Sequence, residues 1–152
     1  MWVPDSRKII TISGHQLRLT IWSLTSNESS YINYPKYSKR GISFSKNGNF
    51  LALIERRQCI DYIGIYETKN WKIVSHFPAE IEDAEDLLWA SDDSAIIVWN
   101  NPFKYKLIVY SISSSQLSLI NPQTNGLGIK KVEISPNQIY IGIGSYDGKV
   151  YL

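Results

Sequence analysis

The sequence predicts an all-β fold, a β-propeller fragment of about three and a half four-stranded antiparallel blades. Three observations lead to this prediction. Aromatic residues end similar alternating segments at a constant spacing of 44 residues, at Trp22, Tyr66 and Tyr110. Short apolar runs of strand length recur with nearly the same period, each preceded by turn-forming residues. No stretch shows a convincing helical periodicity, so a helical solenoid is disfavoured.

Each repeat begins with a strand that ends in a large apolar residue and runs into a turn. These apolar residues are Trp2, Phe44, Trp89 and Ile134. The turns contain Asn, Asp, Gly, Ser or Pro, and the dipeptides Asn47-Gly48 and Asp147-Gly148 are the clearest hairpin signals, because tight turns require backbone conformations that Gly and Asn tolerate. Antiparallel strands connected as a meander are therefore expected.

The apolar runs that follow the turns are predicted to be buried inner strands. They occupy residues 9–12, 50–54, 95–99 and 139–143, and outer strands such as 71–77 and 116–120 close the units. Four strands in about 44 residues match the blade of a WD-repeat propeller. The predicted blades, within one domain of residues 1–152, are 1–35 (incomplete), 40–78, 85–120 and 129–152 (incomplete). A β-sandwich is the alternative, although it needs no fixed period.

The number of blades predicts that this sequence is part of a longer chain. A propeller ring closes with about four to eight blades. A fragment of three and a half blades would leave two sheet edges that recruit other strands.

The composition argues against a nucleic-acid-binding, disulfide-bonded or membrane protein. A net charge of +2 is too small to predict nucleic-acid binding through a basic face. Cys59 is the only cysteine, which excludes an internal disulfide and fits a reducing compartment. Neither a signal peptide nor an apolar run long enough for a membrane span is recognisable, so we expect a cytoplasmic protein without membrane insertion.

No residue set predicts catalysis, a cofactor or a metal site. His15 falls in a predicted loop and His76 in an outer strand, and no Gly-x-Ser-x-Gly segment accompanies them. Cys59 is interpreted as a partly buried filler, and Gly142 and Gly144 as relief for a crowded inner strand. An acidic cluster lacks the spacing of a calcium loop and is expected to be solvated; it comprises Glu80, Glu82, Asp83, Glu85 and Asp86.

Several stretches resemble one family more closely than the fold requires. They are residues 31–36, 41–44, 51–62, Trp71 with His76-Phe77, 105–111, 127–132 and 144–150. In order and over nearly the whole chain, they resemble the WD repeat-containing protein eight family, the spindle-pole and centrosomal WD-repeat proteins. The resemblance implies a non-catalytic scaffold at the centrosome, spindle pole or basal body. It further implies a coiled-coil partner of the synovial-sarcoma-X-interacting type, with roles in anchoring microtubule minus ends, spindle assembly and cilium formation.

The sequence departs from the usual WD-repeat pattern in two ways. It contains no Trp-Asp dipeptide. Asp147 alone occupies the tight-turn Asp position, which Gln16, Ile60 and Lys104 fill in the other repeats. The side-chain network of Asp, His, Ser and Trp is therefore expected to be missing from those blades.

A protein-binding surface is predicted on the face that carries the second-to-third-strand turns and the connections between blades. Its residues are Glu55, Arg56, Arg57, Asp61, Tyr62, Tyr105, Tyr146 and Asp147. Arg and Tyr are frequent in interface hot spots, and a partner helix laid across the loops would suit them. A salt-bridged surface without a partner explains the same residues equally well. Under the first interpretation, changing Arg56 and Arg57 to Glu should abolish partner capture and leave the fold intact.

Two other functions remain open from the sequence. The chain can be a generic WD-repeat subunit of an RNA-processing or vesicle-coat assembly, which salt-dependent RNA binding would test. An enzyme-like propeller would need carboxylates and a His converging on inner strands, where the sequence has Ile, Leu and Val.

Overall fold

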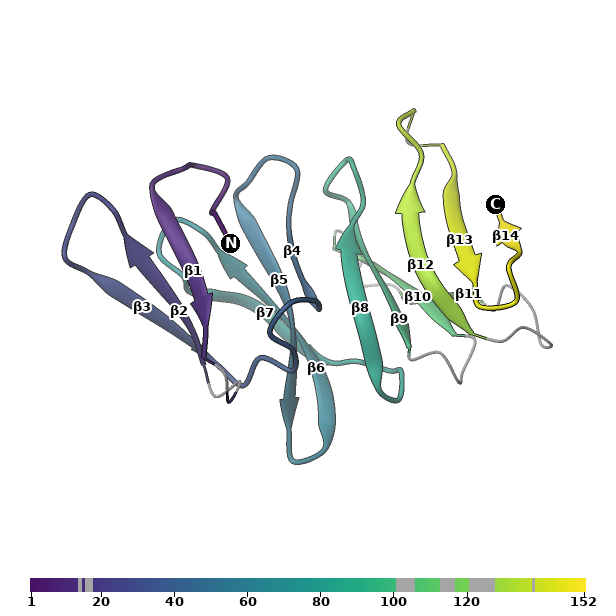
Figure 1. Ribbon diagram of the computed structural model, residues 1–152, viewed down its shortest axis with the longest axis horizontal. Coiled ribbons are helices and arrows are strands. Elements are labelled where there is room, and N and C mark those ends of the chain that lie inside the picture. Colours follow the sequence, from purple (N-terminus) through teal and green to yellow (C-terminus); the bar gives the residue numbers. More distant parts are fainter. Residues whose placement is uncertain (14, 16–17, 101–105, 113–116, 121–127, 138) are drawn as a thin grey trace.

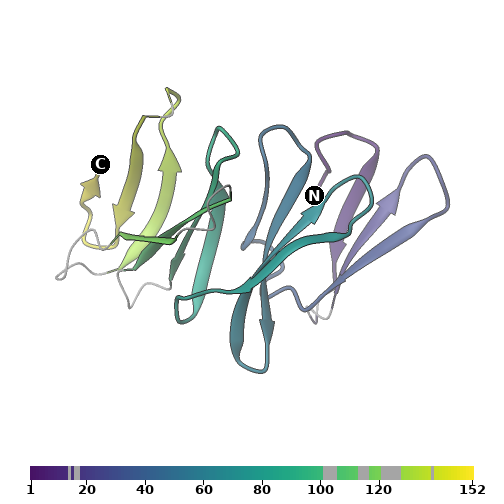
Figure 2. The ribbon, with the colours of Figure 1, turned by 180° about the vertical axis from the view of Figure 1, so that it is seen from behind.

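The computed structural model describes residues 1–152 apart from 14, 16–17, 101–105, 113–116, 121–127 and 138. Every regular element in the described part is a β-strand. The strands form four antiparallel sheets that lie side by side in chain order (Figures 1 and 2). Within the described ranges, no helix has the length and apolar character needed to cross a membrane. The predicted all-β class is confirmed.

Each sheet is a meander in which strands adjacent in sequence are adjacent in space. The first sheet contains β1 (Lys8–Ile12), β2 (Arg18–Ser23) and β3 (Ser29–Asn33), and the second β4 (Ile42–Phe44), β5 (Phe50–Arg57), β6 (Ile60–Glu67) and β7 (Ile73–Pro78). The third contains β8 (Ala84–Trp89), β9 (Ala95–Asn100), β10 (Leu107–Ser111) and β11 (Leu117–Ile120), and the fourth β12 (Ile129–Ile134), β13 (Ile141–Ser145) and β14 (Val150–Tyr151). An isolated bridge between Trp2 and Ile9 extends the first sheet on its inner side.

The predicted hairpin turns have the backbone conformation that their residues suggest. Gly48, between β4 and β5, has φ +73°, and Gly148, between β13 and β14, has φ +80°. Both values lie in the left-handed region, where a side chain would be strained. Asp93 occupies the same region in the β8–β9 turn, with φ 60°, and Asp is among the residues that tolerate it.

The second sheet shows why the inner strands are continuously apolar. Along β5, Leu51 and Leu53 pack into a cluster shared with the first sheet, whereas Ala52 and Ile54 pack into a cluster shared with the third. Successive residues of a strand point to opposite faces, so a sheet covered on both faces needs apolar residues at every position. Each fully buried Leu or Ile contributes about 1.5–3 kcal/mol to stability.

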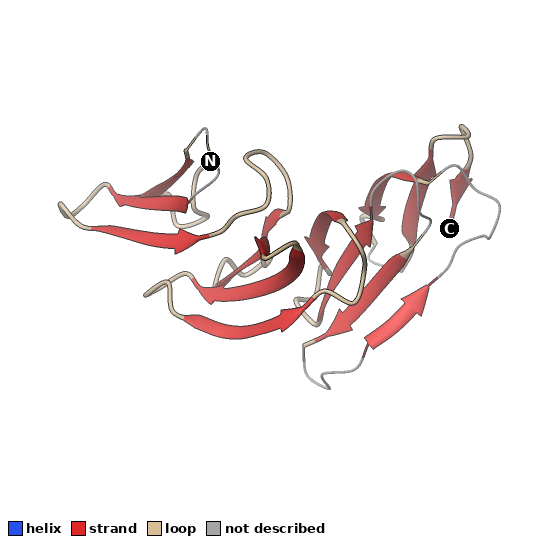
Figure 3. Ribbon diagram, turned by 90° about the horizontal axis from the view of Figure 1, so that it is seen from below, coloured by secondary structure: helices blue, strands red, loops and turns tan. Residues whose placement is uncertain are grey.

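The sheets are related by rotation and do not form a two-layer sandwich. Their first strands face inward, and β4 contacts β8. Viewed from below, the sheets follow one another along a curved line from the N-terminus to the C-terminus (Figure 3). Three separate apolar clusters fill the spaces between consecutive sheets. This arrangement is that of consecutive propeller blades.

The recurring aromatic residues have different environments. Tyr66 and Tyr110 are buried. The Tyr66 hydroxyl donates to Glu55, and the Tyr110 hydroxyl accepts a 2.9 Å hydrogen bond from the backbone N–H of Glu80. Trp22 is 49% exposed and donates through Nε1 to Thr11. The recurring aromatic residue is therefore buried in the second and third sheets and exposed in the first.

Among the glycines that the structure describes, Gly64 has the closest packing around it, and it is neither of the two predicted. A Cβ on Gly64 would overlap Glu55 Oε1 and the Tyr66 ring. A Cβ on Gly142 or Gly144 would lie 3.7 Å from the Glu133 carbonyl oxygen or 3.8 Å from that of Lys131, which is ordinary contact. The interpretation that the paired glycines of β13 relieve crowding is wrong.

We predict that Gly64→Ala lowers the free energy of unfolding by about 1–3 kcal/mol, because the added methyl group must displace the buried Glu55–Tyr66 pair. Gly142→Ala is the matched control on an inner strand and should change stability by less than about 1 kcal/mol. Urea denaturation followed by circular dichroism measures both. Equal effects of the two substitutions would contradict the packing described for Gly64.

Candidate protein-binding groove

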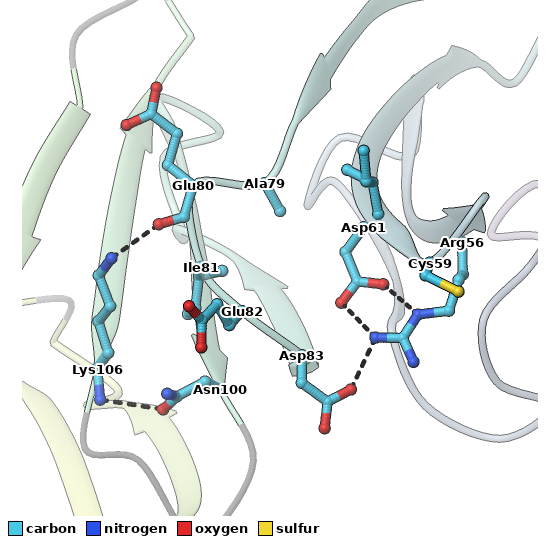
Figure 4. A pocket seen from close by; sticks show the side chains of 11 residues that line it. Arg56, Cys59, Asp61, Ala79, Glu80, Ile81, Glu82, Asp83, Asn100 and Lys106 are labelled. Carbon is cyan, nitrogen blue, oxygen red and sulfur yellow. Dashed lines mark hydrogen bonds and ion pairs between the residues drawn. The ribbon is translucent and has the colours of Figure 1, made fainter.

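A cavity of about 790 Å³ opens between the second and third sheets (Figure 4). We call it the polar groove. One wall is the β5–β6 hairpin end, with Arg56, Cys59, Ile60 and Asp61. The opposite wall is the β7–β8 connection, residues 79–83, together with Asn100 and Lys106 of the third sheet. The second-to-third-strand turn of the second sheet and the connection to the third sheet therefore lie on one face, as the sequence predicts.

Asp61 is the centre of the groove's ion-pair network. Its buried carboxylate accepts hydrogen bonds from Lys36 Nζ at 2.8 Å, from Arg56 Nε at 2.7 Å and from the backbone N–H of Ala84 at 2.8 Å. These donors come from the β3–β4 connection, the end of β5 and the start of β8. One carboxylate thus joins three segments that are distant in sequence.

Asp83 completes the network on the outer side. Its Oδ1 lies 2.8 Å from Lys36 Nζ and 2.8 Å from Arg56 Nη2. The hydrogen bond to Asp61, followed by that to Asp83, raises the pKa of Arg56. Burial alone would lower the pKa of Lys36, but its hydrogen bonds to both carboxylates outweigh this and raise it. Both cations are therefore charged at neutral pH.

The acidic segment is more than a solvated loop, which corrects the interpretation from sequence. Glu85 forms an ion pair with Arg40, and Asp86 accepts a 2.6 Å hydrogen bond from the backbone N–H of Gly41. Asp83 contacts Lys36 and Arg56, as described above. The segment ties the third sheet to the connection that precedes the second sheet. Among the described residues, no group of three His, Cys, Asp or Glu side chains is arranged to hold a metal ion.

A second buried carboxylate, Glu55, organises the other face of the hairpin end. It accepts hydrogen bonds from Tyr66 and from Arg57 Nε at 3.1 Å, and His76 Nε2 lies 3.2 Å from it. The His76 ring stacks on Tyr62 with centroids 4.9 Å apart. His76 is thus part of a packed polar cluster, in agreement with the structural role predicted for it.

Arg57 connects this cluster to the surface. Burial would lower its pKa, but the hydrogen bond to Glu55 raises it overall. Its guanidinium also lies 5.0 Å from the centroid of the half-exposed Tyr34 ring. The arginine therefore has partners on both sides before any other protein approaches.

The structure brings five of the predicted surface residues together and separates the rest. Residues 55–57, Asp61 and Tyr62 share the end of the second sheet, but Glu55 and Asp61 are buried. Tyr146 and Asp147 lie in the β13–β14 turn, on the same side of the molecule but in the fourth sheet (Figure 1). Tyr105 lies outside the described residues.

Several residues of the groove were not found from the sequence. Asn100 of the groove lining gave no local signal, because it is the buried polar end of an apolar strand. Lys36, which belongs to the ion-pair network and not to the lining, gave none either, because its partners lie 25 and 47 positions away. Cys59 was interpreted as partly buried, which is wrong: it is exposed in the β5–β6 turn with φ 65°.

The pairing of the arginines also affects how their reversal to glutamate would be interpreted. Arg56→Glu would place a carboxylate beside buried Asp61, and Arg57→Glu would do the same beside buried Glu55. Removing the partner of a buried charge is strongly destabilising. We therefore expect the double variant to lose stability, so loss of partner capture by it would not by itself identify a binding surface.

Comparison with known proteins supports the family that the sequence resembles in general terms. The chain is 39% identical over 151 residues to WD repeat-containing protein WRAP73 of Mus musculus. This similarity supports the WD-repeat family for the chain. The match covers 99% of this chain and 33% of the relative, so this chain spans about a third of the relative's length. A scan against protein-family models finds no match. WD-repeat proteins are generally scaffolds for protein interactions.

We predict that Asp61→Asn destabilises the protein by about 3–5 kcal/mol, because it leaves the buried ammonium group of Lys36, and Arg56 beside it, with one fewer carboxylate. The matched control is Glu133→Gln, which removes an exposed ion pair with Lys131 and should cost less than about 1 kcal/mol. Chemical denaturation at pH 7 measures both. A loss below 1 kcal/mol for Asp61→Asn would show that the network contributes little.

A pH dependence follows from Tyr66. Burial, and then its hydrogen bond to Glu55, raise the pKa of Tyr66 above its ordinary value, which is about 10. Above that pH the unfolded chain releases a proton that the folded chain retains, so stability falls as pH rises.

The measurement is the free energy of unfolding between pH 8 and about 11. Tyr66→Phe should be less stable than the parent at pH 8, because Glu55 loses a donor, and should show a smaller loss toward high pH. Tyr140→Phe, at an exposed position, should follow the parent. Parallel curves for parent and Tyr66→Phe would rule out this contribution.

Proposed function

We propose that this chain is a non-catalytic interaction scaffold whose polar groove captures a protein partner. The observation that carries the proposal is that the hairpin end of the groove is held in place by hydrogen bonds while an apolar side chain on it stays accessible. Asp61 locks the hairpin end to the neighbouring segments, while Ile60 on the same wall stays 50% exposed. An apolar side chain held at the edge of a polar cavity is suited to a protein interface, where anchors enter preformed pockets.

The partner is proposed to be a coiled-coil protein, and the place of action the centrosome, spindle pole or basal body. The stretches that resemble the spindle-pole WD-repeat family support this, and two of them, residues 31–36 and 51–62, include Lys36, Arg56, Ile60 and Asp61. In this role the scaffold supports microtubule minus-end anchoring, spindle assembly and cilium formation. The 39% identity to a WD-repeat protein supports the scaffold role in general.

We predict that Ile60→Asp, made in the full-length protein, reduces capture of its coiled-coil partner about tenfold or more, because it buries a charge at the interface. Ile139→Asp is the matched control: Ile139 is 71% exposed and lies in the β12–β13 turn on the opposite side of the molecule (Figure 1). Quantitative co-precipitation measures both, and circular dichroism checks their folding. Equal capture by the two variants would disprove the assignment of the groove.

Localisation tests the place of action separately. A tagged full-length protein should concentrate at spindle poles in mitosis and at basal bodies in ciliated cells, and Ile60→Asp should weaken this. Diffuse or membrane staining of the parent protein would contradict the centrosomal role and leave the groove to be judged by the capture experiment.

A further inference from the structure

A second cavity, of about 500 Å³, lies between the same two sheets. We call it the aromatic groove. Its lining includes Phe50, Phe77, Trp89 and Tyr110, with Val74 and Ile112 exposed at its edges. The rings form two contacts across the sheets: Phe50 with Trp89 at 6.3 Å and Phe77 with Tyr110 at 5.0 Å between centroids. The groove is therefore preformed by packed aromatic rings.

Glu80 lines both cavities and marks where they meet. Its backbone is fixed, since its N–H donates to the Tyr110 hydroxyl at 2.9 Å and its carbonyl accepts from Lys106 Nζ at 2.8 Å. Its side chain is exposed and extends away from the ion pairs of Arg56 (Figure 4). Among the described residues its carboxylate has no hydrogen-bond or ion-pair partner. A fixed backbone thus presents an unpaired negative charge at the junction.

The polar groove also contains a donor that lacks an acceptor. Asn100 is fully buried, and its Oδ1 accepts a 3.0 Å hydrogen bond from the backbone N–H of Lys106. That bond fixes the orientation of the amide, since a backbone N–H must meet the oxygen. The remaining Nδ2 has no partner within the described part of the chain. An unpaired buried donor costs about 1–3 kcal/mol, so an acceptor at this place would be favourable.

We propose that the two cavities together receive one segment of the protein partner. Its apolar or aromatic side chain occupies the aromatic groove, and an adjacent Arg or Lys pairs with Glu80. A main-chain carbonyl of the segment enters the polar groove as an acceptor for Asn100. The charge at the junction selects a basic residue, whose aliphatic stem can lie along apolar surface while its head reaches the carboxylate. This inference rests on the proposed function and adds the chemistry of the partner.

Photo-crosslinking to the full-length protein tests the position of the segment. The probe is a short peptide with benzoylphenylalanine two residues from an arginine, and its pair carries glutamate in place of arginine. The arginine peptide should label residues 74–78 or 110–112, and the glutamate peptide should label them about tenfold less. Equal labelling by the two peptides, or labelling confined to other segments, would overturn the proposal.

Variants test the two contacts one at a time. Glu80→Gln keeps the size of the side chain and should weaken binding of the arginine peptide about two- to fivefold, as expected for an exposed ion pair. Ile112→Asp should weaken it about tenfold, because a charge would enter the apolar cavity. Glu133→Gln and Ile139→Asp are the matched controls and should bind as the parent does. Unchanged binding by Glu80→Gln would refute the proposed ion pair between Glu80 and a basic residue of the partner.

Failure of this inference can be told apart from failure of the proposed function. If Ile60→Asp abolishes capture of the coiled-coil partner but the two peptides bind equally, the groove binds a protein by other chemistry, and the inference alone is wrong. If Ile60→Asp captures its partner normally, the proposed function is wrong.

Discussion

Apolar packing between neighbouring sheets is the constraint on which the rest of the structure depends. The second and third sheets bury side chains on both faces, so their inner strands have little room for polar groups. Charged residues are consequently displaced to the ends of the sheets, where strands turn. The polar groove and the Glu55 cluster both lie at such an end, beyond the last apolar residues of β5.

The two buried carboxylates at this end of β5 and β6 show how the displaced charges are satisfied. Asp61 is paired with two cations and a backbone N–H, whereas Glu55 is held by a tyrosine, an arginine and the neighbouring histidine. Both sets join segments that are distant in sequence. The most conspicuous charges of the sequence, Arg56 and Arg57, serve this internal role first. What remains for another molecule is less conspicuous: Ile60, Glu80 and the aromatic side chains between the sheets.

Sequence reasoning recovered the strands well and the site only in part. A period of 44 residues and the hairpin dipeptides are local signals, and the structure has strands and turns where they predict them. The contact of the β5–β6 hairpin end with the acidic segment followed from the order of strands in a blade. The ion pair between Lys36 and Asp61 could not be predicted, because nothing near Lys36 in the sequence distinguishes it from a surface lysine. Likewise, the acidic segment reads as solvated until Arg40, Lys36 and Gly41 are placed beside it.

The sequence by itself determined the class of fold, because alternating apolar residues, turn dipeptides and a fixed repeat length specify four-stranded units whose faces must be covered. Tertiary structure alone decided which polar residues are buried and paired. That choice depends on contacts between segments far apart in the chain, such as Lys36 and the Ala84 carbonyl at a separation of 48 residues, and the local sequence does not specify such contacts. The burial of Glu55 and, within the described part of the chain, the unpaired carboxylate of Glu80 are decided at this level.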